Sequence, residues 1–257
     1  MFPGSNYVYY AMYFVGLAIA LVINLKTYDR YNIKKGKTVF YTLLTFFLGI
    51  AGALLMGKIY TAVNHSLGVQ TSGSVAIFGA VFFCPVFVIA FLFVSEKLFG
   101  AKKSHWRDVM DLLSSGVFIV LTTAKLGCFF NGCCHGVESS FGVYNSRVQT
   151  TVFPVQLFEI CTMTIILLAS FYYTFRSKKF IRGTVYPVTA LMYSVSRFCW
   201  EFLRYYTTQE ERHLIFGLTF WQAMCILVFV LSAVSIALLK NVKEKPQVKK
   251  IVHRKKR

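Results

Sequence analysis

The sequence predicts an all-α membrane protein of seven transmembrane helices, with the N-terminus outside and the C-terminus in the cytoplasm. Apolar runs of about 18 to 22 residues recur along the chain, and a run of that length crosses a hydrocarbon core roughly 30 Å thick. Hydrophobic residues make up 56% of the chain and charged residues only 15%, which is too apolar for an ordinary soluble domain.

The seven expected helices share this length and apolar character. In chain order they cover approximately residues 7–25, 38–57, 74–95, 112–130, 155–175, 184–203 and 218–239. We expect one membrane domain over residues 1–240 and a basic cytoplasmic tail over 241–257. The first six residues contain no Lys or Arg and no cleavage-site pattern, so no removable signal peptide is expected. Gly49, Gly52 and Gly57 in the second helix predict close helix packing.

The basic residues are distributed unevenly, which sets the expected orientation. Of the 28 Lys and Arg residues, 22 lie in four segments: 26–37, 96–111, 176–183 and the tail from 240. With seven helices these segments fall on one side of the membrane, and the positive-inside rule makes that side cytoplasmic. The net charge of +18 therefore indicates a topology anchor on anionic lipid, and no nucleic-acid partner is expected.

Residues 124–136 combine a lysine inside an apolar run with a polar segment rich in cysteine. A charge within the hydrocarbon region costs several kcal/mol, roughly 2.5–3.5 on insertion scales, and usually serves a function. At about 1.5 Å per residue, Lys125, Glu159, Arg197 and Glu201 fall in one layer of the outer leaflet. They lie on the fourth, fifth and sixth expected helices.

The sixth helix carries its polar residues on one face. Tyr193, Arg197, Glu201 and Arg204 follow the spacing i, i+4, i+8, i+11. The excess of cations in this layer predicts an anionic ligand, which at that depth is a phospholipid headgroup. A purely structural ion-pair network is the alternative. We expect a charged outer-leaflet cavity at the first, third, fourth, fifth and sixth helices.

The cysteine motif leaves three interpretations open. Cys128, Cys133 and Cys134 lie where an oxidising exterior permits a disulfide or structural thiols. A second interpretation is a reactive thiol activated by Lys125. A zinc site with His135 is the third, but the spacing matches no common zinc pair, and two adjacent cysteines suit one tetrahedral ion poorly. We therefore expect no metal here.

Five segments resemble the bacterial prolipoprotein diacylglyceryl transferase family, in the same order along the chain. The segment 125–136 resembles the family signature Gly-Arg-x-Gly-Asn-Phe-x-Asn-Gly-Glu-x-x-Gly, and 153–159 its His/Tyr-Pro-Ser-Gln-Leu-Tyr-Glu motif. Residues 193–204 resemble Tyr-x3-Arg-x3-Glu-Phe-x-Arg, and 218–222 resemble Ser-Met-Gly-Gln in the last helix. Residues 9–16 match the first helix.

The resemblance implies transfer of a diacylglyceryl group from phosphatidylglycerol to the lipobox cysteine of a preprolipoprotein signal peptide, in a bacterial cytoplasmic membrane. It implies no cofactor and no metal. The residues expected to take part in catalysis are Arg197, Lys125, Glu201, Tyr193 and His135. Those expected to bind substrate are Arg204, Tyr9, Asn131, Gly136, Gln156 and Glu159.

This chain departs from the family pattern at several positions. Lys125 replaces an arginine, Cys128 and Cys133 replace Asn and Glu, and Phe78 replaces a histidine of the third helix. A divergent branch with a cysteine motif is indicated. His135 is the nearest candidate base, with a solvated loop histidine as the alternative. Other function classes that fit are a lipid- or solute-binding transporter and a membrane thiol–disulfide protein.

Overall fold

The computed structural model describes residues 6–31, 33–66, 68, 75–99, 106–177, 180–206 and 217–241. These residues form seven α-helices, and every expected helix is present. They are α1 (Asn6–Thr27), α2 (Lys35–Ser66), α3 (Phe78–Phe99), α4 (Trp106–Phe130), α5 (Val155–Arg176), α6 (Val185–Glu201) and α8 (Phe220–Asn241). The helix α2 continues beyond the expected end at residue 57. Of the expected basic tail, residues 242–257 lie outside the described part of the chain.

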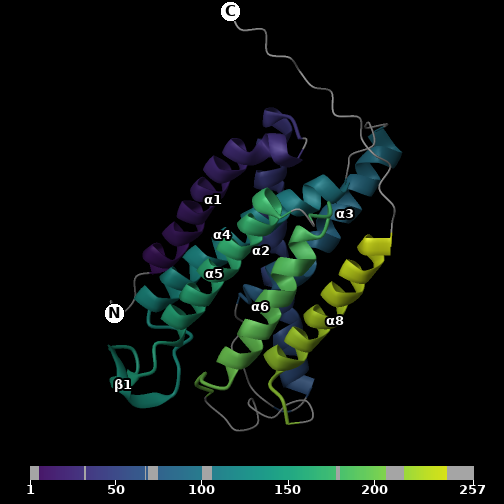
Figure 1. The fold of residues 1–257 in the computed structure, drawn as a ribbon. Helices are drawn as coiled ribbons and strands as arrows, with labels where there is room; N and C mark the ends of the chain where they lie inside the picture. The colour runs from purple at the N-terminus through teal and green to yellow at the C-terminus, as the bar shows by residue number, and fades with distance from the viewer. Residues whose placement is uncertain are drawn as a thin grey trace, which may run out of the picture.

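Six of these helices are long and apolar enough to cross a membrane, so the chain is a mostly helical, multi-pass membrane protein. The helix that does not meet this criterion is α6, which has 17 residues and contains Arg197 and Glu201. It is the shortest α-helix of the described residues, although it lies alongside the other helices in the bundle (Figure 1). The seven-span count and the orientation stay predictions.

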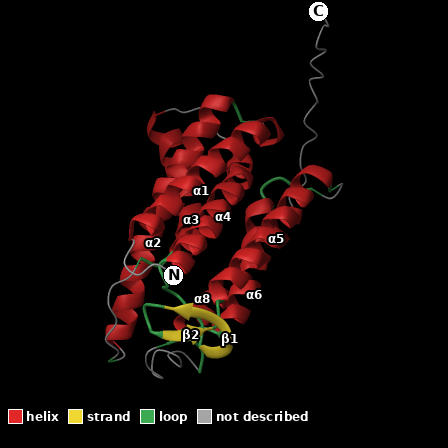
Figure 2. Cartoon of the chain, turned by 90° about the vertical axis from the view of Figure 1, so that its left-hand side faces the viewer, coloured by secondary structure: helices red, strands yellow, loops and turns green. Residues whose placement is uncertain are grey.

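A small β-hairpin was not expected from the sequence. The strand β1 (Glu138–Asn145) pairs antiparallel with β2 (Thr150–Val152) between α4 and α5. A short 3-10 helix, η1 (Tyr28–Tyr31), follows α1. Figures 1 and 2 place the hairpin beyond the ends of the helices, where α4 ends and α5 begins. The helix α1 begins at this same end, whereas α8 ends at the opposite one.

Glycine allows two pairs of helices to approach closely. A Cβ added at Gly52 in α2 would lie 2.7 Å from the carbonyl oxygen of Gly79 in α3. A Cβ at Gly127 in α4 would lie 3.2 Å from Cα of Tyr9 in α1. Real Cβ atoms essentially never lie within 3.0 Å of such an atom, so only glycine permits the contact at Gly52, whereas a side chain at Gly127 would require α1 and α4 to shift slightly apart. The expected close packing of α2 is confirmed at Gly52.

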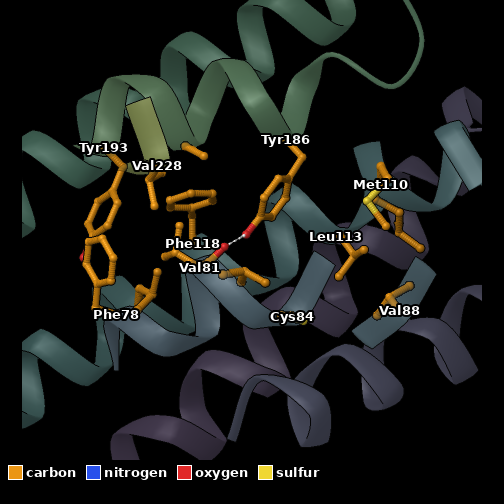
Figure 3. Packing of buried hydrophobic residues seen from close by; sticks show 14 of the residues in the cluster. Phe78, Val81, Cys84, Val88, Met110, Leu113, Phe118, Tyr186, Tyr193 and Val228 are labelled. Carbon is orange, nitrogen blue, oxygen red and sulfur yellow. Dashed lines mark hydrogen bonds between the residues drawn. The ribbon is translucent and has the colours of Figure 1, made fainter. Parts of the chain in front are cut away.

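An aromatic cluster joins α3, α4 and α6 (Figure 3). The ring of Tyr193 lies 5.9 Å from that of Phe78 and 5.6 Å from that of Phe118. The hydroxyl of Tyr186 donates a hydrogen bond to the carbonyl oxygen of Val81, at 2.6 Å. Phe78, which replaces the family histidine, is therefore a buried core residue.

A buried carboxylate fixes the start of α6 against α4. Asp111 accepts hydrogen bonds from the backbone N–H groups of Gly183 at 2.7 Å and Val185 at 2.9 Å. The first N–H groups of a helix have no partner within the helix, so this carboxylate caps α6 from a neighbouring helix. The contact sets the position of α6 and thus of Arg197 farther along it.

A cavity of about 370 Å³ lies among α1, α2, α3 and α4. Its lining is mostly apolar, with Tyr9 and Tyr13 at one end and residues such as Phe46, Val117 and Leu121 along its walls. The charged cavity expected at α1, α3, α4, α5 and α6 is a different one and stays a prediction. The charged side chains of α4, α5 and α6 instead point towards one another.

Candidate active site

Five charged side chains from α4, α5, α6 and the segment after α6 meet in one cluster. We call Lys125, Glu159, Arg197, Glu201 and Arg204 the ion cluster. Glu159 is its centre: its Oε2 lies 2.6 Å from Nζ of Lys125 and 3.4 Å from Nη2 of Arg204. Its Oε1 lies 3.3 Å from Nη1 of Arg197. The convergence expected from helix rise is confirmed.

Glu201 forms the second anionic position of the ion cluster. Its carboxylate pairs with Arg197 one helical turn earlier, and with Nε of Arg204 at 3.7 Å. Thr219 donates a hydrogen bond to it at 3.2 Å, and the hydroxyl of Tyr206 donates another. Thr219 and Tyr206 were not expected as site residues: Thr219 lies in the segment 218–222 that resembles a family motif, but that resemblance did not indicate a contact with Glu201, and Tyr206 lies outside every such segment.

The ion cluster is buried and carries an excess of positive charge. Only 6% of Lys125 and 3% of Glu159 is exposed. Three cations share two carboxylates, which leaves the cluster with one excess positive charge. Nε of Arg204 is also buried without a hydrogen-bond partner in the described part of the chain. Because uncompensated buried charge is costly, the arrangement suits a bound anion.

Arg204 reaches the cluster by a route that the helical spacing did not predict. The helix α6 ends at Glu201, so Arg204 is not on its face as expected. Instead its backbone forms an isolated β-bridge with Gly136. Val137 N–H donates to the carbonyl oxygen of Leu203 at 3.0 Å, next to this bridge. The bridge turns the Arg204 side chain back towards Glu159.

Gly136 has a backbone role at this junction. A Cβ at Gly136 would lie 2.6 Å from the carbonyl oxygen of Phe153 and 2.8 Å from that of Leu203. Its own N–H donates to the carbonyl oxygen of Phe153 at 3.0 Å. Gly136 therefore lets three segments meet: the loop after α4, the start of α5 and the end of α6.

The loop that follows α4 brings three thiols together. The sulfur atoms of Cys128, Cys133 and Cys134, which we call the thiol triad, all lie within 4.8 Å of one another. All three are free thiols in the structure. Cys133 N–H donates to the carbonyl oxygen of Cys128 at 3.1 Å, so the chain folds back at the end of the helix. Gln156 Nε2 donates to the carbonyl oxygen of Cys133 at 2.7 Å.

Two residues of this turn have left-handed backbone. Gly132 has φ +69°, and a Cβ there would lie 2.7 Å from Oδ1 of Asn145. Cys134 has φ +57° although it is not glycine, a conformation that is sterically costly and tends to occur at functional sites. Asn145 Nδ2 donates to the carbonyl oxygen of Gly132 at 2.9 Å. The hairpin therefore stabilises the turn that carries the thiols.

The surroundings shift the pKa values of the Cys133 and Cys134 thiols in opposite directions. Hydrogen bonds from the thiols of Cys128 and Cys133 hold the pKa of Cys134 well below its ordinary value, and the charges of Arg204 and Lys125 lower it further. The bond with Cys128 lowers the pKa of Cys133, but the bond with Cys134 and burial outweigh it and raise that pKa to about 12. One thiolate is thus favoured, at Cys134.

His135 and Tyr9 lie beside the cluster rather than in it. Nδ1 of His135 is 2.9 Å from the carbonyl oxygen of Gly136, and its ring stacks on Tyr205 at 5.2 Å. A carbonyl oxygen only accepts, so Nδ1 carries the proton and Nε2 holds the free lone pair. Tyr9 shares a 2.7 Å hydrogen bond with the hydroxyl of Tyr13, and both residues line the apolar cavity.

Three other expected site residues have structural contacts. The Asn131 N–H donates to the carbonyl oxygen of Gly127 at 3.0 Å in the last turn of α4, and its side chain is half-buried. Tyr193 is buried in the aromatic cluster below Arg197. Gln156 is fully buried, and its Oε1 has no hydrogen-bond partner in the described ranges.

A buried ion cluster inside a bundle of membrane-crossing helices, beneath a thiol-bearing loop, defines a multi-pass membrane protein with an intramembrane polar site. Ionisable residues within the membrane usually serve a function and are not there only to stabilise the fold. Comparison with known sequences then identifies the family. The chain belongs to the prolipoprotein diacylglyceryl transferase family, whose sequence model matches residues 3–238.

Relatives of this chain are 24% to 28% identical to it over the aligned residues. A phosphatidylglycerol–prolipoprotein diacylglyceryl transferase of Clostridium tetani is 24% identical over 79% of this chain and 83% of its own length. One from Tropheryma whipplei is 28% identical over 81% of each chain. A second such transferase of Clostridium perfringens is 27% identical over 77% of this chain and 78% of its own. No solved structure matches the chain significantly.

Proposed function

We propose that this chain transfers a diacylglyceryl group from phosphatidylglycerol to the cysteine thiol of a prolipoprotein. The relatives carry this activity in their names, and the family match covers most of the chain. The observation that supports placing the reaction at this site is the buried ion cluster with its excess positive charge. It lies in the membrane-crossing bundle, where the phosphate of a lipid headgroup is the available anion.

In this proposal Arg197, Arg204 and Lys125 bind the lipid phosphate in different ways. Arg197 and Arg204 present planar guanidinium groups that bind two phosphate oxygens at once, whereas Lys125 acts as a point charge. As the bond between the glyceryl carbon and the phosphate oxygen breaks, negative charge grows on the leaving phosphate, and these cations stabilise it. Glu159 and Glu201 hold the cations in place, and Tyr193 supports Arg197 from below.

The acceptor thiol must lose a proton before it attacks. His135 is the base in this proposal, since its Nε2 holds a free lone pair while Nδ1 is bound to the Gly136 carbonyl. Asn131, Gly136 and Gln156 shape the surrounding loop, and Tyr9 contacts the lipid at the mouth of the cavity. No cofactor takes part in this scheme.

The substrates set the expected location. Phosphatidylglycerol and a prolipoprotein signal peptide meet in a bacterial cytoplasmic membrane, with the ion cluster in the outer leaflet. This location requires the hairpin end of the bundle to face outside and the basic tail to lie in the cytoplasm. The membrane domain then covers residues 1–240.

Arg197→Ala tests the anion site. We expect transfer from labelled phosphatidylglycerol to a lipobox peptide to fall by at least about 10²-fold, as for loss of a transition-state charge contact. Arg197→Lys should retain part of the rate. Arg176→Ala, at the far and exposed end of α5, is the matched control. Both the thioether product and the released glycerol phosphate are measured.

Two results would exclude this function. Transfer at the wild-type rate in the purified Arg197→Ala protein would assign the ion cluster a purely structural role. Movement of labelled lipid across proteoliposomes without any thioether product would favour the transporter. In both cases elution from size-exclusion chromatography in detergent confirms that the variant is folded.

A further inference from the structure

We propose that the thiol triad binds one Zn²⁺ ion, and that the open coordination position of this ion takes the thiol of the acceptor cysteine. The second half of this inference rests on the proposed function; the first half does not. The triad is formed by Cys128 at the end of α4 and by Cys133 and Cys134 in the following turn.

The positions of the sulfur atoms fit a thiophilic ion. Zinc binds thiolates at about 2.3 Å, which places sulfurs about 3.8 Å apart in a tetrahedron. The three sulfurs here lie within 4.8 Å of one another. Side-chain rotations that bring the sulfurs about 1 Å closer together would give the separations of a tetrahedral zinc site. A donor set of three sulfurs selects soft or borderline ions over Mg²⁺ and Ca²⁺, which require oxygen ligands.

The backbone removes the objection that adjacent cysteines suit one ion poorly. In extended chain, neighbouring side chains point to opposite sides. Cys134 is left-handed instead, with φ +57°, and follows a left-handed Gly132. This turn is held by two hydrogen bonds: Asn145 to the Gly132 carbonyl at 2.9 Å, and Gln156 to the Cys133 carbonyl at 2.7 Å. The structure thus maintains a costly backbone conformation that gathers the sulfurs.

The triad reaches the protein surface at Cys134. Cys128 is buried, Cys133 is half-buried and Cys134 is exposed. Three protein ligands with an accessible fourth position are the arrangement of catalytic zinc sites, whereas structural sites use four protein ligands. His135 follows directly, but the side chains of the described residues whose ligand atoms lie within 4.8 Å of one another are the three cysteines, without His135. The fourth position is therefore left for an exogenous ligand.

Coordination would add to the activation of the acceptor thiol that His135 supplies in the proposed function. A thiol that coordinates Zn²⁺ is deprotonated outright. Its proton passes to His135 or to water. The bound sulfur then forms a bond to the glyceryl carbon, the carbon–oxygen bond breaks, and its electron pair leaves with the phosphate held by Lys125 and Arg204.

Metal binding is tested with the full-length protein in detergent after thiol reduction and dialysis against Zn²⁺. We expect one zinc per chain by elemental analysis, and a cadmium–thiolate absorption band when Cd²⁺ replaces it. Cys128→Ser, Cys133→Ser and Cys134→Ser should each lose most of the bound metal. Cys161→Ser, an exposed cysteine on α5, should bind as the wild type does. Elution from size-exclusion chromatography verifies folding.

Substrate coordination is tested by spectroscopy of the Co²⁺-loaded wild-type protein, which needs no variant. A lipobox peptide should shift the cobalt absorption bands, and the same peptide with serine in place of its cysteine should not. Chelation should reduce transfer by at least tenfold, and added Zn²⁺ should restore it.

The outcomes separate this inference from the proposed function. Absence of bound metal, equal metal binding in the triad variants, or a disulfide in the protein as isolated from the membrane would overturn the zinc site. Full transfer activity in the chelated protein would overturn it as a participant while leaving the transferase intact. A peptide-dependent shift of the cobalt absorption bands without any lipid transfer would support thiol coordination and would contradict the proposed transferase function.

Discussion

At the residue scale, Glu159 holds the ion cluster together. One carboxylate faces Lys125, Arg197 and Arg204 on three different segments. Its removal leaves three buried cations with only Glu201 as a partner. Breaking a buried ionic pair in this way costs about 3–5 kcal/mol, because the remaining charge is uncompensated.

Glu159→Gln should therefore lower the stability of the protein markedly. We expect a fall in the thermal unfolding midpoint in detergent of several degrees or more. Glu96→Gln, on the exposed end of α3, is the control and should change little. An unaltered midpoint in the Glu159 variant would mean that water or lipid reaches the cluster and screens its charges.

At the element scale, the loop after α4 is joined to the ends of α5 and α6 through backbone contacts. Gly136 permits this junction, because any side chain there would overlap with the carbonyl oxygens of Phe153 and Leu203. The same junction turns Arg204 back towards Glu159. A change of one glycine should thus move a charged side chain of the site.

Gly136→Ala should reduce lipid transfer much more than it reduces helix content. A displacement of about 1 Å at a reacting centre can cost on the order of 10²-fold in rate, and circular dichroism should show the helices intact. Gly36→Ala, where a Cβ meets nothing within 4 Å, provides the comparison. If Gly136→Ala transferred lipid as fast as the control, the junction would not position Arg204.

At the scale of the whole molecule, the number of membrane crossings depends on α6. Six helices qualify by length and hydropathy, and α6 is the seventh. An odd number of crossings places the two termini on opposite sides, whereas an even number places them together. The basic tail, with nine Lys and Arg residues from position 240, favours the cytoplasm.

A fluorescent protein fused after Arg257 should fluoresce in intact cells, because it folds only in the cytoplasm. An epitope tag before Met1 should be cleaved by protease added outside the same cells. Protection of both termini would show an even number of crossings and would make α6 a non-spanning helix. A tag in the 26–37 segment, expected inside, checks that the protease does not enter.

Local pattern was enough to place the helices and much of the ion cluster. A run of 20 apolar residues has few alternatives in a bilayer, because every backbone polar group must be satisfied within the segment. Fixed helical rise then places Lys125, Glu159 and Arg197 at a common depth. The sequence alone thus determined the helical membrane fold and the layer in which the charges meet.

Only the tertiary structure decided how these charges and thiols are arranged. The β-hairpin, the route of Arg204 beyond α6 and the apolar cavity among α1–α4 all depend on contacts between distant segments. The convergence of Cys133 and Cys134 depends on a left-handed turn held by Asn145 and Gln156. Such contacts leave no periodic pattern in the sequence, because each is formed by a few residues far apart in the chain and is stable only once the helices have packed.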